Sequence, residues 1–228
     1  FSYSLLFRSG FEWGDEAAIS DITGISQTLN LWEGEILSRF TWKGNEFNVR
    51  TVCHPAQDMI SAHIDSHLHT GIKFHFPYPT GIHTDNACDW DANDKHSTEV
   101  LKQDTQSAVL KRTLDSTVYY VELKWEGKAL LKEKEKNYFV LLPQEDTFSF
   151  SCAFTANEPD QLTVLPDFFE VESLAKNHWV NFWEEGAAVD FSHCTDPRAK
   201  ELERRVVLSQ YLLAIQCAGS TPPQETGL

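Results

Sequence analysis

The chain has 228 residues, of which 41% are hydrophobic, and a formal net charge of −15 at pH 7. This length is enough for one large domain or for one and a half small ones. Polyanion binding requires clustered Lys and Arg, and the one basic run, residues 132–136, alternates with glutamates, so we expect no nucleic-acid partner. No apolar run is long enough to cross a bilayer, so we also expect no membrane span.

The cysteine and aromatic content narrows the chemistry further. The five cysteines are scattered, odd in number and without C-x-x-C spacing, which predicts neither a zinc cluster nor a disulfide framework. We expect most of them to be small buried residues, with a single bridge as the open alternative. We expect no metal and no cofactor. The abundant Trp and Phe residues would serve either a hydrophobic core or a sugar-binding surface.

Residues up to about 165 have the pattern of antiparallel β-structure. Short segments rich in β-branched and aromatic residues are separated by turn signals such as Lys43-Gly44-Asn45 and His54-Pro55. Many short strands without intervening helices predict a mainly β fold, an antiparallel sandwich or barrel, in a domain spanning 1–165. Strands are expected at 27–32, 35–41, 46–53, 59–67, 71–76, 106–114, 117–125, 128–135, 137–142 and 147–154.

After Pro166 the hydrophobic period changes from that of a strand to that of a helix. Gly186 is the expected end of this helix. The segment therefore predicts a helical linker over 166–195. Its apolar face is expected to consist of Val171, Leu174, Ala175, His178, Trp179, Phe182 and Trp183.

A second helix is expected to begin at Asp196. Its side chain can accept free backbone N–H groups, Pro197 suits the first helical position, and Gly219 is the expected terminator. From Val206 the helix is apolar almost all round, which is typical of a helix covered on every side. Because little chain follows, we expect its cover to lie beyond Leu228 and the chain to be part of a larger protein.

A histidine-rich segment is the first candidate for chemistry. Asp65, His67 and His69 resemble the D-x-H-x-H start of metal-dependent amidohydrolases, in which two imidazoles bind one metal ion. On a strand these side chains would share one face with Ser61 and His63, while the alternate residues face the core. That family needs further metal ligands on alternating β and α units, which the sequence does not offer. A polar strand face packed against a neighbouring domain or water is therefore favoured.

The second candidate is the long polar insertion at residues 77–96, because loops of this length are usually functional or mobile. Carboxylates and imidazoles beside a tryptophan suit a sugar subsite, since the sugar ring stacks on the indole and its hydroxyls bind the acids. A solvated acidic loop is the alternative, and calcium binding is disfavoured because the spacing is not that of an EF-hand. The polar and aromatic residues concerned are His83, Asp85, Asp89, Trp90, Asp91, Asp94 and His96.

The later part of the chain resembles a known family. Residues 177–183 (NHWVNFW), 189–191 (VDF), 196–212 (DPRAKELERRVVLSQYL) and 222–228 (PPQETGL) are similar to the six-hairpin glycosidase-like proteins. These are large (α/α)6-barrel enzymes related to glycoside hydrolase family 65. The resemblance implies an antiparallel β super-sandwich (1–165), a helical linker (166–195) and the first helix of an (α/α)6 barrel (196–228).

The same resemblance implies a role in a glycoside hydrolase or phosphorylase that acts on an oligosaccharide. The sandwich would shape one wall of the active site and support the C-terminal (α/α)6 barrel of the same protein. Asp89 and Trp90, together with Gln224 and Glu225, would contact the carbohydrate substrate. Glycoside cleavage needs two carboxyl groups flanking the bond, which would lie beyond Leu228. We therefore expect no catalytic residue in this chain and no turnover by this chain alone. We also expect a secreted or periplasmic location.

Two other functions stay open. The sandwich could bind carbohydrate by itself, with Trp90 as a stacking platform, and oligosaccharide titration of the chain would detect this. A metal hydrolase built on His67 and His69 is the third possibility, and elemental analysis of the purified chain would test it.

Overall fold

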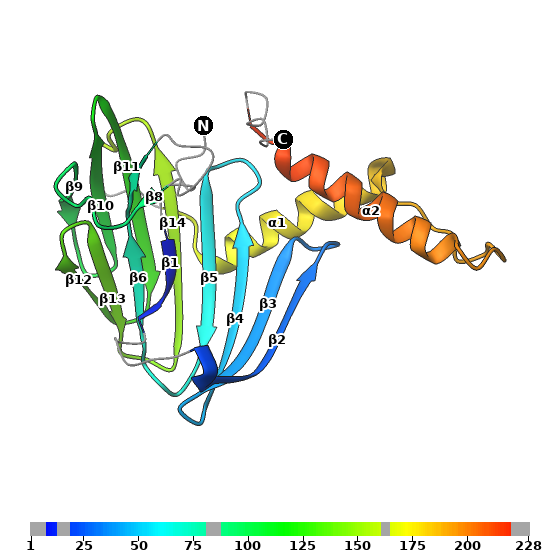
Figure 1. The fold of residues 1–228 in the computed structure, drawn as a ribbon, viewed down its shortest axis with the longest axis horizontal. Coiled ribbons are helices and arrows are strands. Elements are labelled where there is room, and N and C mark those ends of the chain that lie inside the picture. The colour runs from blue at the N-terminus through cyan, green and yellow to red at the C-terminus, as the bar shows by residue number, and fades with distance from the viewer. Residues whose placement is uncertain (1–7, 13–18, 81–87, 161–164, 220–228) are drawn as a thin grey trace.

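The computed structural model describes residues 8–12, 19–80, 88–160 and 165–219. They form two facing antiparallel β-sheets, with two helices at one side of the larger sheet (Figure 1). The predicted mainly β, antiparallel sandwich is confirmed. The division into three domains and the assignment of the last helix to a barrel stay predictions.

Eight strands make the larger sheet and four make the smaller one. The larger sheet has the order β2 (Ile22–Asn30), β3 (Glu35–Trp42), β4 (Asn45–Cys53), β5 (Met59–Asp65), β14 (Thr147–Thr155), β11 (Thr117–Glu126), β10 (Ser107–Leu114) and β9 (His96–Gln103). The smaller sheet has the order β1 (Arg8–Glu12), β6 (Gly71–His75), β13 (Tyr138–Pro143) and β12 (Ala129–Glu135). A ribbon of β7 (Tyr78–Pro79) with β8 (Cys88–Asp89) and a short 3-10 turn, η2 (Ile19–Asp21), complete the sandwich.

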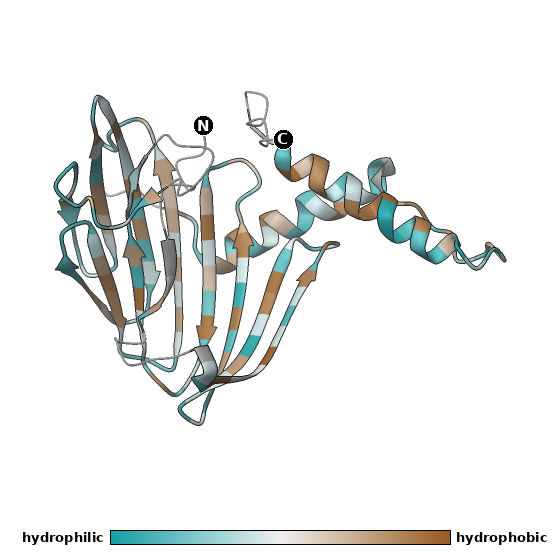
Figure 2. Ribbon diagram, viewed as in Figure 1, coloured by the Kyte–Doolittle hydropathy of each residue, from teal (hydrophilic) through white to brown (hydrophobic). Residues whose placement is uncertain are grey.

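The hydrophobic core lies between the two sheets. Along β11, Tyr119, Val121, Leu123 and Trp125 all point into it, as their alternation in sequence indicates. Figure 2 shows this alternation of apolar and polar residues along many of the strands. Burying one large apolar side chain contributes about 1.5–3 kcal/mol, so this layer supplies much of the stability of the sandwich.

Every strand expected from the sequence is present, and two edge strands were not predicted. The first, β9, has only Val100 and Leu101 as large apolar residues, and both are exposed. The second, β1, pairs only with β6. These two strands have few apolar residues at alternate positions, so periodicity alone does not reveal them, whereas it does predict the edge strands β2 and β12.

The linker helix α1 (Phe168–Phe182) packs on the outer face of the larger sheet. A capping box starts it: the Asp167 carboxylate accepts the Glu170 N–H at 2.9 Å, and Glu170 accepts the Asp167 N–H at 3.0 Å. Its buried residues Phe168, Val171 and Ala175 form a second core with Val52, Met59, Ala153 and Leu165.

This helix covers the polar face predicted for β5. The Ser61 hydroxyl lies 2.9 Å from that of Ser151, and the His63 ring lies 5.2 Å from the Phe168 ring. Ser61 and His63 therefore lie under the linker helix, whereas the favoured interpretation named a neighbouring domain or water as the cover of this face. Desolvation by burial lowers the pKa of the His63 imidazole below its usual value, which favours the neutral ring.

The end of the linker helix follows the prediction in part. A π-helical turn, η3 (Trp183–Ala187), follows α1, and Gly186 adopts the left-handed φ of 116°. Leu174 and His178, expected on the apolar face, are exposed. They lie at the edge of the stripe that contacts the sheet, so the buried face is narrower than expected.

The second helix, α2 (Ala199–Gln216), begins later than expected. The Asp196 carboxylate accepts the Arg198 N–H at 2.9 Å and pairs with its guanidinium at 2.8 Å, so it orders the turn before the helix. Pro197 also lies in that turn, and the helix ends before Gly219. None of the described helices is long and apolar enough to cross a membrane.

Most cysteines are not buried, contrary to expectation. All five are free thiols, and Cys152 alone is fully buried, where desolvation raises the pKa of its thiol. Cys194 and Cys217 are exposed because they lie outside the sandwich, after the linker helix and after α2.

An aromatic junction joins the β2–β3 turn to both helices. It consists of Trp32, Trp179, Trp183 and Tyr211. The Trp183 ring stacks on Trp32 with centroids 6.4 Å apart, and the Trp179 ring lies 5.0 Å from Tyr211. The Trp183 indole N–H also donates to the Leu31 carbonyl at 2.7 Å. Within the junction, the Trp179–Tyr211 contact joins α2 to α1.

Candidate functional site

Asp89 and Trp90 lie on a short strap at the smaller sheet. We define the strap as residues 77–80 and 88–95. Its two parts form the ribbon β7–β8, in which Tyr78 pairs with Asp89. The insertion is therefore partly β-structure rather than a plain loop, and His96 at its end begins β9 and is buried. His83 and Asp85 lie outside the described residues.

Trp90 completes an aromatic strip on the outer face of the smaller sheet. Ile72 and Phe74 of β6 enter the core, so His75 points outward. The Trp90 ring lies 4.8 Å from the His75 ring, which in turn stacks on Tyr138 at 4.8 Å. The register of β6 with β13 places Tyr138 directly opposite His75.

The aromatic strip has the features of a sugar-stacking surface. Its three rings, from Trp90, His75 and Tyr138, are all half-buried, so each is fixed by packing and still presents part of its surface. Charged groups border it: the Lys134 ammonium lies 5.4 Å from the centre of the Tyr138 ring and 2.8 Å from a Glu12 carboxylate oxygen. Aromatic rings beside polar groups suit a ligand with one apolar and one hydroxylated face.

Asp89 is oriented by its own turn. One carboxylate oxygen accepts the Asp91 N–H at 3.0 Å. An Asx turn of this kind fixes the side chain and leaves it acceptor capacity for a ligand hydroxyl. On the paired strand, the Tyr78 hydroxyl donates to Asp115 at 3.1 Å, which raises the pKa of the phenol. Asp89 therefore lies in the β7–β8 ribbon and Trp90, the next residue, directly after it; their contact with a sugar stays a prediction.

Sequence reasoning missed His75 and Tyr138. Both belong to strands that were predicted, but nothing local indicates that β6 and β13 are neighbours. The outward parity of His75 between two core residues is the only signal available. Gln224 and Glu225 lie outside the described residues, so their predicted substrate contacts stay predictions.

The histidine segment does not have the geometry that the amidohydrolase-like pattern suggested. Strand β5 ends at Asp65, so His67 and His69 do not continue its polar face. Their imidazoles bind separate oxygens of Asp146, at 2.7 and 2.8 Å, while Asp65 accepts from the Thr147 hydroxyl at 3.0 Å. Among the described residues, no group of three or more His, Cys, Asp or Glu side chains could hold a metal ion.

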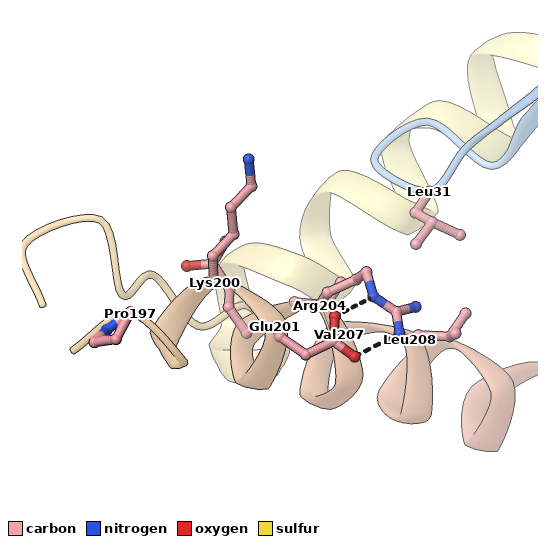
Figure 3. Close-up of a pocket in the computed structure, with 8 residues that line it drawn as sticks. Leu31, Pro197, Lys200, Glu201, Arg204, Val207 and Leu208 are labelled. Carbon is pink, nitrogen blue, oxygen red and sulfur yellow. Dashed lines mark hydrogen bonds and ion pairs between the residues drawn. The ribbon is translucent and has the colours of Figure 1, made fainter.

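A groove of about 650 Å³ separates the β2–β3 turn from the start of α2 (Figure 3). Leu31 of the turn and Leu208 of α2 both line it, and Arg204 on the same helix is bound to Glu201 at 2.9 Å (Figure 3). Hydrogen bonds from Arg204 and Arg205 lower the pKa of Glu201 to about 2, so this carboxylate is ionised and already paired with these two arginines. Of the predicted ligand contacts that the structure describes, neither Asp89 nor Trp90 lines this groove.

No family model matches the sequence, and no curated protein matches it. Among solved structures, the chain is similar to a protein described as a kojibiose phosphorylase from the human microbiome, with a TM-score of 0.55 and 11% identity. The match covers 92% of this chain and 30% of that chain. At this identity the similarity shows a shared fold alone. The chain thus shares the fold of part of that protein, and it spans less than a third of that protein's length.

Proposed function

We propose that this chain is the sandwich and linker of a carbohydrate-active enzyme related to glycoside hydrolase family 65. The observation that carries the proposal is the extent of the fold similarity, 92% of the chain. Residues 1–165 are 165 of 228, or 72%, so the match extends beyond the sandwich into the helical part. The sequence resemblance at residues 177–228 points independently to the same family.

In this proposal the sandwich shapes one wall of an active site and supports an (α/α)6 barrel. The exposed apolar residues of α2 are consistent with such a partner: Leu202 is 53% exposed and Leu213 is 65% exposed. Patches of this kind in soluble proteins usually mark contacts with another domain or protein. The further helices of the barrel would cover them.

The proposed ligand is an oligosaccharide, bound beside Asp89 and Trp90 and, from the resemblance, beside Gln224 and Glu225. Hydrolysis or phosphorolysis of a glycoside needs an acid and a second group across the bond, and these belong to the barrel in our proposal. The chain itself contributes binding and orientation. A secreted or periplasmic location is part of the same proposal.

A structure of the barrel-containing protein with a bound oligosaccharide tests this function. We expect the sugar within contact distance of the strap or of residues 224–225. A sugar bound far from both would remove the site assignment. Calorimetric titration of the same oligosaccharide into the isolated 228-residue chain should show little affinity, and tight binding there would instead support a free-standing carbohydrate-binding module.

A further inference from the structure

A fully buried arginine lies beneath the strap. Arg112 points inward from β10, and its guanidinium lies 4.9 Å from the centre of the Phe76 ring. Desolvation lowers the pKa of this guanidinium, yet arginine keeps its charge in proteins. In the described part of the chain no carboxylate pairs with it. A buried charge is costly unless its donors are satisfied, so its partners show what the residue holds in place.

The Arg112 guanidinium donates to oxygen atoms at both ends of the insertion. Its Nη1 donates to the Thr98 hydroxyl at 2.7 Å and to the Ser97 carbonyl at 3.1 Å, just beyond the strap. Its Nη2 lies 3.5 Å from the Pro77 carbonyl, where the strap begins. A single side chain thus links the two points at which the chain leaves and re-enters the sandwich.

Asn137, in the β12–β13 turn, extends this network into the strap. Its side-chain oxygen accepts from Arg112 at 3.2 Å and from the Thr98 hydroxyl at 2.9 Å. Its amide nitrogen donates to the Asn93 carbonyl at 3.3 Å and lies 3.4 Å from Nε2 of His96. Asn137 is fully buried and has a left-handed φ of 64°, which asparagine tolerates better than most residues.

We propose that Arg112 is a positioning residue that, through Asn137, holds the strap so that Trp90 stays on the aromatic strip. A two-stranded ribbon such as β7–β8 is marginal by itself, so its placement depends on contacts of this kind. The fixed fork of the guanidinium reaches several carbonyl and hydroxyl oxygens at once, which a lysine ammonium on a flexible chain does not. That the strap contacts a sugar rests on the proposed function, whereas its placement by Arg112 and Asn137 does not.

Hydrogen exchange of the 228-residue chain, read by mass spectrometry, measures strap order without any sugar. In Arg112→Met we expect the amides of residues 88–95 to exchange at least tenfold faster, while β5 and β14 keep their protection. The strap should remain loosened in Arg112→Lys, because lysine restores the positive charge but not the planar guanidinium that binds several oxygens at once. Arg39→Met, which removes an exposed arginine of β3, is the matched control and should leave the strap unchanged.

Asn137→Gly provides a milder variant in case Arg112→Met does not fold. Glycine accepts the left-handed backbone without strain, so only the side-chain bonds are lost. We expect faster exchange confined to the strap. Unchanged exchange at residues 88–95 in Asn137→Gly, or equal loss of protection in β5 and β14, would overturn the inference. A loosened strap with undiminished oligosaccharide affinity in the barrel-containing protein would uphold it and count against the proposed sugar site.

Discussion

Trp90 shows at the residue scale how one side chain depends on partners that are distant in sequence. Its ring rests on His75 of β6, which stacks on Tyr138 of β13. Three segments of the chain therefore build one surface, and the conformation of each ring restricts the next. A rigid aromatic surface loses little conformational entropy when a sugar binds, which favours its use as a contact.

Replacing Trp90 with alanine should weaken oligosaccharide binding by the barrel-containing protein roughly threefold to tenfold. Aromatic contacts contribute about 0.5–1.5 kcal/mol beyond their buried area, and 1.4 kcal/mol corresponds to a factor of ten. Isothermal titration calorimetry measures the change. Trp32→Ala, at the aromatic junction, is the control, and equal losses in both variants would argue against a local role of Trp90.

His96 makes the strap region sensitive to acid. Burial, with help from Arg112, Lys136 and His75 and against Asp94, lowers the pKa of His96 to about 4. The unfolded chain therefore binds a proton near pH 6.5 that the folded state resists until about pH 4. The contribution to stability is complete above the unfolded pKa and is lost as pH falls between these values. We expect His96→Gln to flatten this part of the stability profile, measured by urea unfolding at several pH values; an unchanged profile would contradict the assignment.

At the element scale, the contact between the β2–β3 turn and α1 depends on a glycine. Gly34 has a φ of 69°, and a Cβ atom there would lie 2.0 Å from Cδ1 of Trp179. The turn can approach the helix this closely only without a side chain. The aromatic junction, and with it the attachment of α2, therefore depends on a residue that contributes no side chain of its own.

Gly34→Ala should lower the free energy of unfolding by several kcal/mol and disturb the Trp fluorescence of the junction. Gly44→Ala is a matched control, because Gly44 also has a left-handed φ, of 75°, but nothing lies within 4 Å of its added Cβ. The free energy of unfolding of the control should fall only by the cost of placing alanine in the left-handed conformation, about 1–2 kcal/mol. Equal losses in chemical denaturation would show that the Trp179 contact is unimportant.

At the scale of the whole molecule, the chain is acidic and its helix α2 carries exposed apolar residues beside the sandwich. The sandwich buries its core between two sheets, whereas in α2 only Ala199 is buried. Figure 2 shows apolar bands recurring along α2. The net charge of −15 favours solubility, and the apolar helix opposes it.

We therefore expect the isolated chain to bind a hydrophobic dye and to self-associate through α2. The double variant Leu202→Glu and Leu213→Glu should reduce both, because it places charges on the exposed helix surface. The melting temperature should change little, since neither side chain packs in the sandwich core. Analytical ultracentrifugation and dye fluorescence measure the effect, and unchanged association would mean that another surface is responsible.

The local pattern of the sequence is sufficient for many of the elements. The alternation along residues 117–125 predicts β11 because side-chain direction in a strand has a period of two. The change of period after Pro166 predicts α1 for the corresponding reason, and Gly186, the expected terminator, lies in the turn η3 that follows it. Such features depend on neighbours within one or two turns of chain, so they can be inferred without knowing the fold. The polar edge strands β1 and β9 lack this pattern and were missed.

Sequence periodicity does not indicate which strands are neighbours, and only the tertiary structure shows this. Pairing of β6 with both β1 and β13 places Tyr138 beside His75, and the ribbon then brings Trp90 onto the same face. Strand β5 ends at Asp65, so His67 and His69 lie beyond the polar strand face on which the sequence alone would place them. By itself the sequence determined the mainly β class, the order of sandwich and helices, and Asp89 and Trp90 as neighbours in the chain. Only the fold decided their surroundings, because strand pairing joins residues that are far apart in the chain and leave no local signal.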